Sequence, residues 1–305
     1  MKIMNDRDVM AIPTRTAVAV MEEVFRERSM RSFISPPRMH MDSPDGKIVF
    51  TSGGSLSEHV MGFRVYTTFG DGDQATLVYD SKNGKLKGAV MGSFLGALRT
   101  GSIGAVSTRY MSNHNADIMG IIGSGNQAFT QAITSATVRN FREIHVYSPN
   151  TEHRNNFADR IEKVTGILAV AEESSSAVAE ISQVLILATT SSVPVIKAGD
   201  IAPGTHIISV GRKSINEHEL DHDVADLAAV VATDSLDQIN SYDPPHFMSG
   251  SKTGGNIVEL ADVVSGKKLG RISRDDITLF LSVGLSGTEV ALANLVLESS
   301  GRKEP

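Results

Sequence analysis

Residues 117–128 read DIMGIIGSGNQA, and this stretch decides the fold. Its first six residues form a short apolar run, and a helical pattern follows the glycines. The spacing of Gly123, Gly125 and Ala128 matches GxGxxA. In that motif the first glycine permits a tight turn, the second lets a pyrophosphate approach the backbone, and the small third residue packs the helix against the strand. The stretch therefore predicts a strand, a phosphate-binding turn and a helix, which open a dinucleotide-binding fold.

Strand-like and helix-like segments alternate after this stretch. We expect helices over 126–139, 151–164, 174–181 and 216–227, and strands over 143–147, 168–170, 184–188, 206–210 and 229–233. The strand VLILA at 184–188 carries no charge, as expected where both faces of a parallel sheet are covered. The alternation predicts a doubly wound parallel sheet with right-handed crossovers.

The flanking segments have a different pattern. We expect an amphipathic helix over 13–28, strands over 47–52, 62–68 and 75–80, a glycine-containing helix over 91–110 and a C-terminal helix over 276–299. The predicted fold class is α/β: a Rossmann-type doubly wound parallel sheet, residues 113–270, inserted in an α+β domain. Residues 1–112 and 271–305 build that second domain, with the C-terminal helix packing on the first segment.

Composition excludes several classes of function. The 305 residues include no cysteine, so disulfides, thiolate nucleophiles and cysteine–zinc sites are ruled out. The net charge of −6 argues against a general nucleic-acid binder. We expect no membrane segment, since no apolar run approaches the roughly 20 residues that a spanning helix needs. We also expect a cytoplasmic location. The histidines form no pattern typical of a metal site, so we expect no metal.

The end of the second strand bears on the choice between NAD and NADP. Enzymes that bind NAD tend to carry an Asp or Glu there, whereas this chain reads Tyr147-Ser148-Pro149-Asn150. Ser148, Asn150 and Arg154 suit a 2′-phosphate, or alternatively belong to an ordinary turn and a solvated helix face. The pattern predicts a nicotinamide cofactor, NADP or NAD, and favours NADP.

Further motifs stand in a fixed order along the chain. They are Pro37-Arg38, Gly62-Phe63-Arg64, Asp80 with Asn83-Gly84, Leu98-Arg99-Thr100-Gly101, the glycine motif, Ala188-Thr189-Thr190-Ser191, Pro203-Gly204-Thr205-His206 and Glu219-Leu220. In these motifs the sequence resembles the ornithine cyclodeaminase/mu-crystallin family over nearly its whole length. The resemblance implies a homodimer, a substrate and dimerisation domain around an inserted Rossmann domain, and NAD(P)-dependent chemistry at the Cα–N bond of amino acids.

The resemblance also implies site residues. Arg38 matches the arginine that binds the substrate carboxylate, which suits a guanidinium because it can donate two parallel hydrogen bonds. Arg99 matches a second arginine, at the junction of substrate and cofactor, and Thr100 accompanies it. The alternatives are a surface ion pair for Arg38 and a helix-surface charge for Arg99.

Two positions depart from the family pattern. Arg64 stands where the family usually has a lysine close to the substrate, and arginine cannot exchange a proton near neutral pH. It either orients an anionic substrate or is a strand arginine that faces solvent. Lys213 stands where cyclodeaminases and several dehydrogenases of the family carry an aspartate. Three roles are open for it: proton donor, ligand of a second substrate carboxylate, or decoration of a surface loop.

The expected catalytic residues are therefore Arg38, Arg64, Arg99 and Lys213. The expected cofactor-binding residues are Arg99, Thr100, Gly123, Ser124, Gly125, Asn126, Gln127, Ala128, Ser148, Asn150, Ala188, Thr189, Thr190, Ser191, Val210 and Gly211.

Three functions fit this set of residues. The favoured hypothesis is an NAD(P)-dependent imino acid reductase or amino acid dehydrogenase, since a protonated imine needs mainly positioning for hydride transfer. Cyclodeamination of ornithine is less favoured, because Arg64 and Lys213 would repel a cationic side chain. The third hypothesis is a protein that binds NAD(P) or a small ligand without turnover, in which both departures mark lost catalytic residues.

Overall fold

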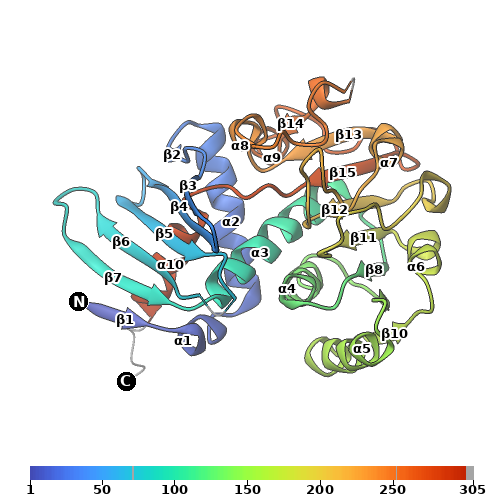
Figure 1. Ribbon diagram of the computed structural model, residues 1–305, viewed down its shortest axis with the longest axis horizontal. Coiled ribbons are helices and arrows are strands. Elements are labelled where there is room, and N and C mark those ends of the chain that lie inside the picture. Colours follow the sequence, from blue (N-terminus) through green and yellow to red (C-terminus); the bar gives the residue numbers. More distant parts are fainter. Residues whose placement is uncertain (71, 252, 300–305) are drawn as a thin grey trace. The chain divides into compact units, whose positions relative to one another are not determined.

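The computed structural model describes residues 1–70, 72–251 and 253–299 (Figure 1). The chain divides into two compact units, one comprising Met1–Arg99 with Gly284–Pro305 and the other comprising Thr100–Val283. These limits differ from the expected domain ends at residues 112 and 271. Helix α3 (Phe94–Met111) runs through the first limit, and a strand over residues 277–281 belongs to the second unit.

The first unit is built on a mixed sheet. Its elements are β1 (Lys2–Met4), α1 (Asp6–Met10), α2 (Thr14–Ser29), β2 (Phe33–Ile34), β3 (Met39–Ser43), β4 (Gly46–Ser55), β5 (Val60–Thr67), β6 (Gln74–Asp80), β7 (Leu86–Met91), the start of α3, and α10 (Thr288–Ser299). The strand order is β1-β7-β6-β5-β4-β2, with β3 paired to β4, and only the β1–β7 pair in this sheet is parallel among the described residues. Helix α10 packs on β4 to β7 and against α2 (Figure 1).

The second unit is built on a parallel sheet. Its strands are β8 (Ile118–Ile122), β9 (Glu143–Tyr147), β10 (Leu168–Ala171), β11 (Val184–Leu187), β12 (His206–Ser209), β13 (Ala228–Thr233), β14 (Val258–Glu259) and β15 (Ile277–Leu281). Its helices, besides the rest of α3, are α4 (Asn126–Ser135), α5 (Thr151–Thr165), α6 (Ser175–Ile181), α7 (His222–Asp226), α8 (Leu236–Asn240) and α9 (Leu260–Val264), with short 3₁₀ turns at Ala198–Asp200 and Gly254–Asn256. The order is β10-β9-β8-β11-β12-β15-β13-β14, with every pair parallel. The predicted doubly wound α/β fold is confirmed.

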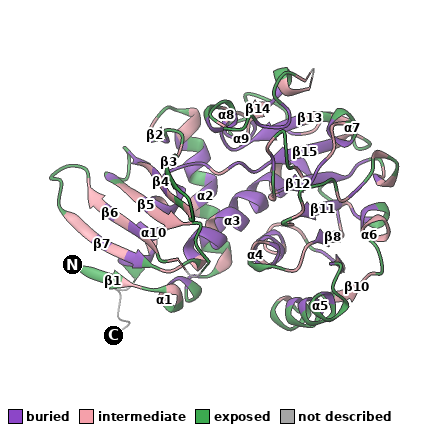
Figure 2. Ribbon diagram, in the orientation of Figure 1, coloured by how far each residue is buried: buried purple, intermediate pink, exposed green. Residues whose placement is uncertain are grey.

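The central strands of this sheet are covered on both faces. Every residue of β11 and β12 is buried, and Figure 2 shows the middle of the parallel sheet buried. Strands buried on both faces read as continuous apolar runs, which explains the uncharged sequence VLIL in β11. The strand order reverses between β8 and β11, and ligands of such sheets bind outside the carboxyl ends of the strands at that point.

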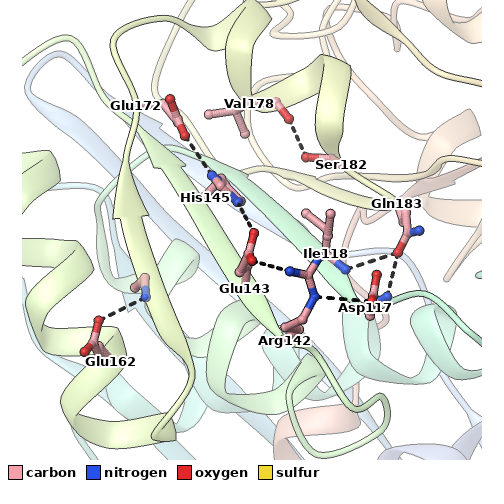
Figure 3. Close-up of polar contacts among 11 residues, drawn as sticks. Asp117, Ile118, Arg142, Glu143, His145, Glu162, Glu172, Val178, Ser182 and Gln183 are labelled. Carbon is pink, nitrogen blue, oxygen red and sulfur yellow. Dashed lines mark hydrogen bonds and ion pairs between the residues drawn. The ribbon is translucent and has the colours of Figure 1, made fainter.

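Side chains tie together the amino ends of the strands (Figure 3). Gln183 precedes β11, and its Oε1 accepts hydrogen bonds from the backbone N–H groups of Asp117 at 2.6 Å and Ile118 at 3.1 Å. Arg142 bridges the starts of β8 and β9, with its Nη1 2.5 Å from Glu143 Oε1 and its Nε 3.6 Å from Asp117 Oδ2. This network fixes the edge of the sheet opposite the one expected to carry function.

Two predicted helices were wrong in part. Residues 276–299 form strand β15 and helix α10 instead of one helix, because the β-branched and aromatic run Ile277–Leu281 inserts between β12 and β13. Residues 216–227 contain only the short α7, because the chain before it forms isolated β-bridges at Lys213 and Ser214. Within the described residues, no helix combines the length and apolar character that crossing a bilayer requires.

His206 is a buried titratable group in the core of the second unit. It has no exposed surface, and its ring nitrogens lie 2.9 Å from Thr278 Oγ1 and 3.2 Å from Ser107 Oγ. Burial, followed by the charges of Arg271 and Arg139, lowers the pKa of His206 to about 3. The folded protein therefore holds this imidazole neutral at pH values where the unfolded chain protonates it.

We predict that His206 makes the fold sensitive to acid. Its pKa lies at about 3 in the folded chain and near 6.5 in the unfolded chain. Its contribution to stability is therefore complete above pH ~6.5 and is lost as the pH falls toward ~3, at up to about 1.4 kcal/mol per pH unit. Urea unfolding of the unaltered chain and His206→Gln between pH 7 and 4 measures this. The variant should show a shallower decline, and parallel declines would contradict the assignment.

Candidate functional site

The glycine turn after β8 lies directly against the end of β11. Gly123 has φ of +119°, and a Cβ placed on it would lie 2.3 Å from the carbonyl oxygen of Ala188. A side chain is therefore excluded both by conformation and by space. The turn brings the carboxyl ends of β8 and β11 together at the point where the strand order reverses.

The N-terminus of α4 is open to a phosphate. Gly125 is its N-cap, no described side chain caps it, and a Cβ on Gly125 would meet nothing within 4 Å. The first N–H groups of a helix have no partner inside the helix and favour anions. Asn126 is exposed, Ala128 is fully buried, and Oε1 of Gln127 is buried with no hydrogen-bond partner among the described residues. This cradle fits the pyrophosphate of a dinucleotide.

Ser148 and Arg154 meet at the carboxyl end of β9. Ser124 Oγ donates to Ser148 Oγ at 3.1 Å, which links the glycine turn to the end of β9. Arg154 is 5% exposed, with Nη1 3.3 Å from the carbonyl oxygen of Ser148 and Nη2 2.7 Å from Glu173 Oε2. Arg154 therefore does not lie on a solvated helix face. The Asn150 side chain accepts from the backbone N–H of His153 at 2.9 Å and caps α5, as the alternative of an ordinary turn implies.

The later strand ends supply a second group of expected cofactor residues. Ala188, Thr189 and Ser191 follow β11 and are half-buried, and Thr190 beside them is exposed. Val210 and Gly211 follow β12 and are also half-buried. Thr100 lies apart from them on α3, where it is buried and its carbonyl oxygen accepts from Gln131 Nε2 at 3.2 Å.

Lys213 is buried, so the alternative of a surface decoration was wrong. It is 3% exposed, and its Nζ donates to the carbonyl oxygen of Gly211 at 2.5 Å. Its charge also acts on His246: burial first, then the charges of Lys213, His218 and His222, lower the pKa of His246 to about 3. A lysine held in the loop after β12 places a positive charge at the carboxyl edge of the parallel sheet.

Three arginines and one buried glutamate gather in the first unit. Glu289 is fully buried on α10, and its Oε1 lies 3.0 Å from both Arg64 Nη1 and Arg99 Nη2. A Cβ placed on Gly284 would lie 2.9 Å from Arg38 Nη2 and 3.7 Å from both Nη atoms of Arg99. The three arginines that the sequence predicts as substrate ligands therefore share one small region.

Arg64 does not face solvent, so that alternative was wrong. It is 9% exposed, and its Nη2 donates to Gln74 Oε1. Its Cζ lies 4.4 Å from the centre of the Tyr66 ring, a cation–π contact. A Cβ on Gly96 would lie 2.5 Å from Arg64 Nη2, so the guanidinium occupies the space that a side chain at position 96 would need. Arg64 is held in one orientation from several sides.

The cluster carries an excess of positive charge. Burial alone would favour the protonated form of Glu289, but the charges of Arg99 and then Arg64 outweigh it and hold the pKa of this carboxyl below its ordinary value. Among the described residues, the Glu289 carboxylate thus pairs with two guanidinium groups, those of Arg64 and Arg99. Within the described residues, Nε and Nη1 of Arg99 are buried without a hydrogen-bond partner. Such a region favours an anionic ligand with several acceptor oxygens.

Sequence reasoning missed two buried carboxylates. Glu289 lies in the first turn of α10, directly before the apolar run Val290–Leu292, and this position beside apolar residues was the available signal. Glu219 was noted only as part of a motif, although it is fully buried. Among the described residues, no group of three or more His, Asp or Glu side chains is arranged to hold a metal ion.

Comparison with known proteins gives one family. The sequence profile of the ornithine cyclodeaminase/mu-crystallin family matches residues 3–304. An alanine dehydrogenase of Archaeoglobus fulgidus is 27% identical over 299 residues, covering 93% of this chain and 90% of that protein. Iminosuccinate reductase of Paracoccus denitrificans is 25% identical, covering 99% of this chain and 98% of that protein. The structure of Thermococcus litoralis Delta(1)-pyrroline-2-carboxylate reductase, in complex with NADH and L-proline, has a TM-score of 0.91 and 30% identity, covering 98% of this chain and 97% of that one.

We predict that Glu289→Gln destabilises the chain strongly. Removing one partner of a buried ion pair leaves uncompensated charge and costs about 3–5 kcal/mol. Urea unfolding followed by circular dichroism measures the change. The matched control is Glu298→Gln on the same helix, whose side chain is 60% exposed and which should change stability by less than about 0.5 kcal/mol. Equal effects of the two substitutions would contradict the role assigned to Glu289.

Proposed function

Because the chain belongs to the ornithine cyclodeaminase/mu-crystallin family and is an NAD(P)-dependent oxidoreductase of that family, we propose that it reduces 2-imino acids to 2-amino acids. The observation that carries the proposal is the pairing of both Arg64 and Arg99 with the one carboxylate of Glu289, in a region that Arg38 shares near Gly284, as the described residues show it. Its excess positive charge suits the carboxylate of an imino acid and disfavours a cationic substrate.

In this proposal the arginines bind and orient the substrate. Arg38 and Arg99 donate hydrogen bonds to the substrate carboxylate. Nε and Nη1 of Arg99, which have no hydrogen-bond partner among the described residues, supply some of these donors. Arg64, which is held by Glu289 and Gln74, keeps the region positive without exchanging a proton. A protonated imine is already electrophilic, so orientation contributes most of what this chain must supply.

The cofactor-binding residues of the proposal lie at the carboxyl ends of β8, β9, β11 and β12. Gly123–Gly125 and the start of α4 hold the pyrophosphate, and the loops after β11 and β12 hold the nicotinamide half. A bound reduced nicotinamide supplies the hydride that adds to the imine carbon. Partial burial of Thr189 and Gly211 helps to exclude water from the hydride donor.

Ser148 and Arg154 support a preference for NADP over NAD. Glu173, the partner of Arg154, has a side chain that is 89% exposed, so a 2′-phosphate can compete with it for the guanidinium. No acidic residue stands among 147–150 to accept a hydrogen bond from a free 2′-hydroxyl. We therefore expect a lower KM for NADPH than for NADH.

Lys213 has two roles within the proposal. Its buried ammonium either donates a proton at the substrate nitrogen or binds a second carboxylate of the substrate. Lys213→Met separates them: loss of kcat with every substrate indicates the proton donor, and a raised KM confined to dicarboxylic substrates indicates the second carboxylate. Either positive role opposes cyclodeamination, which must bind a cationic amine.

We also propose a homodimer formed through the uncovered face of the first sheet. Val60 and Val78 point toward α10 and are buried, whereas Met61, on the other face of β5, is 45% exposed. Ile34 and Leu56 add exposed apolar surface beside it, around a hollow of about 620 Å³. Sedimentation equilibrium at micromolar concentration should give twice the chain mass, with Met61→Glu shifted toward the chain mass. A monomeric unaltered chain would contradict the dimer.

We predict that reduced nicotinamide is oxidised with a member of a defined panel. The panel comprises 2-oxo acids of one or two carboxylates with ammonia or methylamine, and cyclic imines such as pyrroline-2-carboxylate. The loss of reduced-nicotinamide absorbance is followed with NADPH and with NADH. Arg38→Ala should lower kcat/KM at least about a hundredfold, the effect of losing a bidentate charged contact of roughly 3 kcal/mol.

The control for this assay is Arg142→Ala at the amino edge of the parallel sheet, whose side chain is 61% exposed. It should leave the rate within about twofold, as for other exposed ion pairs. Tight cofactor binding without turnover across the panel, and no proline formed from ornithine with NAD⁺, would overturn the reductase proposal in favour of a binding protein.

A further inference from the structure

Glu219 is a carboxylate whose two oxygens are both fully engaged. It lies in the loop between β12 and α7 and has no exposed surface. Its Oε2 accepts from the backbone N–H of Thr189 at 2.9 Å and from Thr189 Oγ1 at 2.8 Å. Its Oε1 accepts from Ser209 Oγ at 3.0 Å and from the backbone N–H of Gly211 at 2.5 Å. Four donors within the protein thus fill the hydrogen-bond-accepting capacity of the carboxylate, two at each oxygen.

These donors come from two different strand ends. Thr189 lies just beyond β11, while Ser209 ends β12 and Gly211 lies just beyond it. The backbones are drawn close: a Cβ on Gly211 would lie 2.1 Å from Glu219 Oε2 and 2.5 Å from the carbonyl oxygen of Thr189. The carboxylate therefore sets the spacing of the loops after β11 and β12. Lys213 joins the same arrangement through its hydrogen bond to the Gly211 carbonyl oxygen.

We infer that Glu219 is a positioning residue for the nicotinamide half of the cofactor. The inference rests on the proposed function, which assigns that half to the loops after β11 and β12. Glu219 acts through Thr189 and Gly211 and does not touch the cofactor, since its oxygens are occupied within the protein. Among the described residues, Glu219 accepts no hydrogen bond from the phosphate cradle at Gly123–Gly125.

The arrangement requires a carboxylate, not only a polar side chain. An amide at this position accepts through one oxygen only, and its NH₂ group would face two of the four donors. The hydroxyl of that pair can rotate to accept from the NH₂ group, but the backbone N–H is left without an acceptor and is either buried unmatched or moves away to reach water. Separation of the two loops follows, while the turn after β8 keeps its own contacts with Ala188 and Ser148.

The test compares the binding affinity for a complete dinucleotide with that for ADP-ribose, the part without nicotinamide. Binding of NADPH and of NADH, and of ADP-ribose, which lacks the nicotinamide, is measured by titration calorimetry without substrate. In Glu219→Gln the affinity for the better dinucleotide should fall at least about tenfold, as expected for a lost charged hydrogen bond, and that for ADP-ribose should stay within about twofold. Glu217→Gln is the matched control, because Glu217 lies in the same loop, is exposed and forms an ion pair with the exposed Arg212.

A second variant tests the same inference if Glu219→Gln does not fold. Thr189→Val keeps the shape of the side chain and removes its Oγ1, one of the four donors. It should weaken dinucleotide binding about threefold to tenfold and leave ADP-ribose binding unchanged. Equal losses for dinucleotide and ADP-ribose, or no loss in either variant, would overturn the inference. Because no substrate is present, an unaltered chain that binds dinucleotide but reduces no imine would overturn the proposed reaction and leave the inference standing.

Discussion

The reversal of strand order between β8 and β11 is the constraint on which the rest of the second unit depends. Parallel strands buried on both faces have no free side for a ligand, so chemistry is confined to the loops at their carboxyl ends. Gly123 must be glycine because the carbonyl oxygen of Ala188 occupies the space of a side chain. That contact places an uncapped helix N-terminus and the loop after β11 next to each other. At the amino ends of the strands, by contrast, Gln183 and Arg142 form hydrogen bonds and ion pairs with residues at the starts of β8 and β9.

Two buried carboxylates organise the two units in different ways. Glu289 balances charge: it faces Arg64 and Arg99, and leaves the cluster positive. Glu219 satisfies neutral donors from two loops and fixes their spacing. Each is costly to bury, and each is compensated by contacts that only a carboxylate can make. In both cases the carboxylate that loses its hydration holds other residues in place: Glu289 holds Arg64 and Arg99, and Glu219 holds the two loops.

The sequence predicted those parts whose signals are local. The turn at Gly123 to Ala128 and strand β9 follow directly from motif and periodicity. Strand β15 was mistaken for helix because its five residues, four of them apolar, carry no periodicity, and only pairing with β12 and β13 determines its state. The arginines were identified through resemblance, but their common partner Glu289 lies 190 residues after Arg99 in the sequence. No local pattern predicts such a contact, and the burial of Lys213 depends likewise on packing beyond its own loop.

Arg64 limits the chemistry that this chain can perform, because it stands where the family resemblance implies a lysine. An arginine fixed by Glu289, Gln74 and Tyr66 cannot release a proton near neutral pH, so it can serve neither as acid nor as base. A reaction that starts from a neutral amine and must remove its proton therefore lacks one of its expected groups. Reduction of an iminium ion brings its proton with the substrate and needs only a bound carboxylate and an oriented hydride donor. The substitution is thus compatible with an imine reductase, whereas a cyclodeaminase would need a compensating base elsewhere.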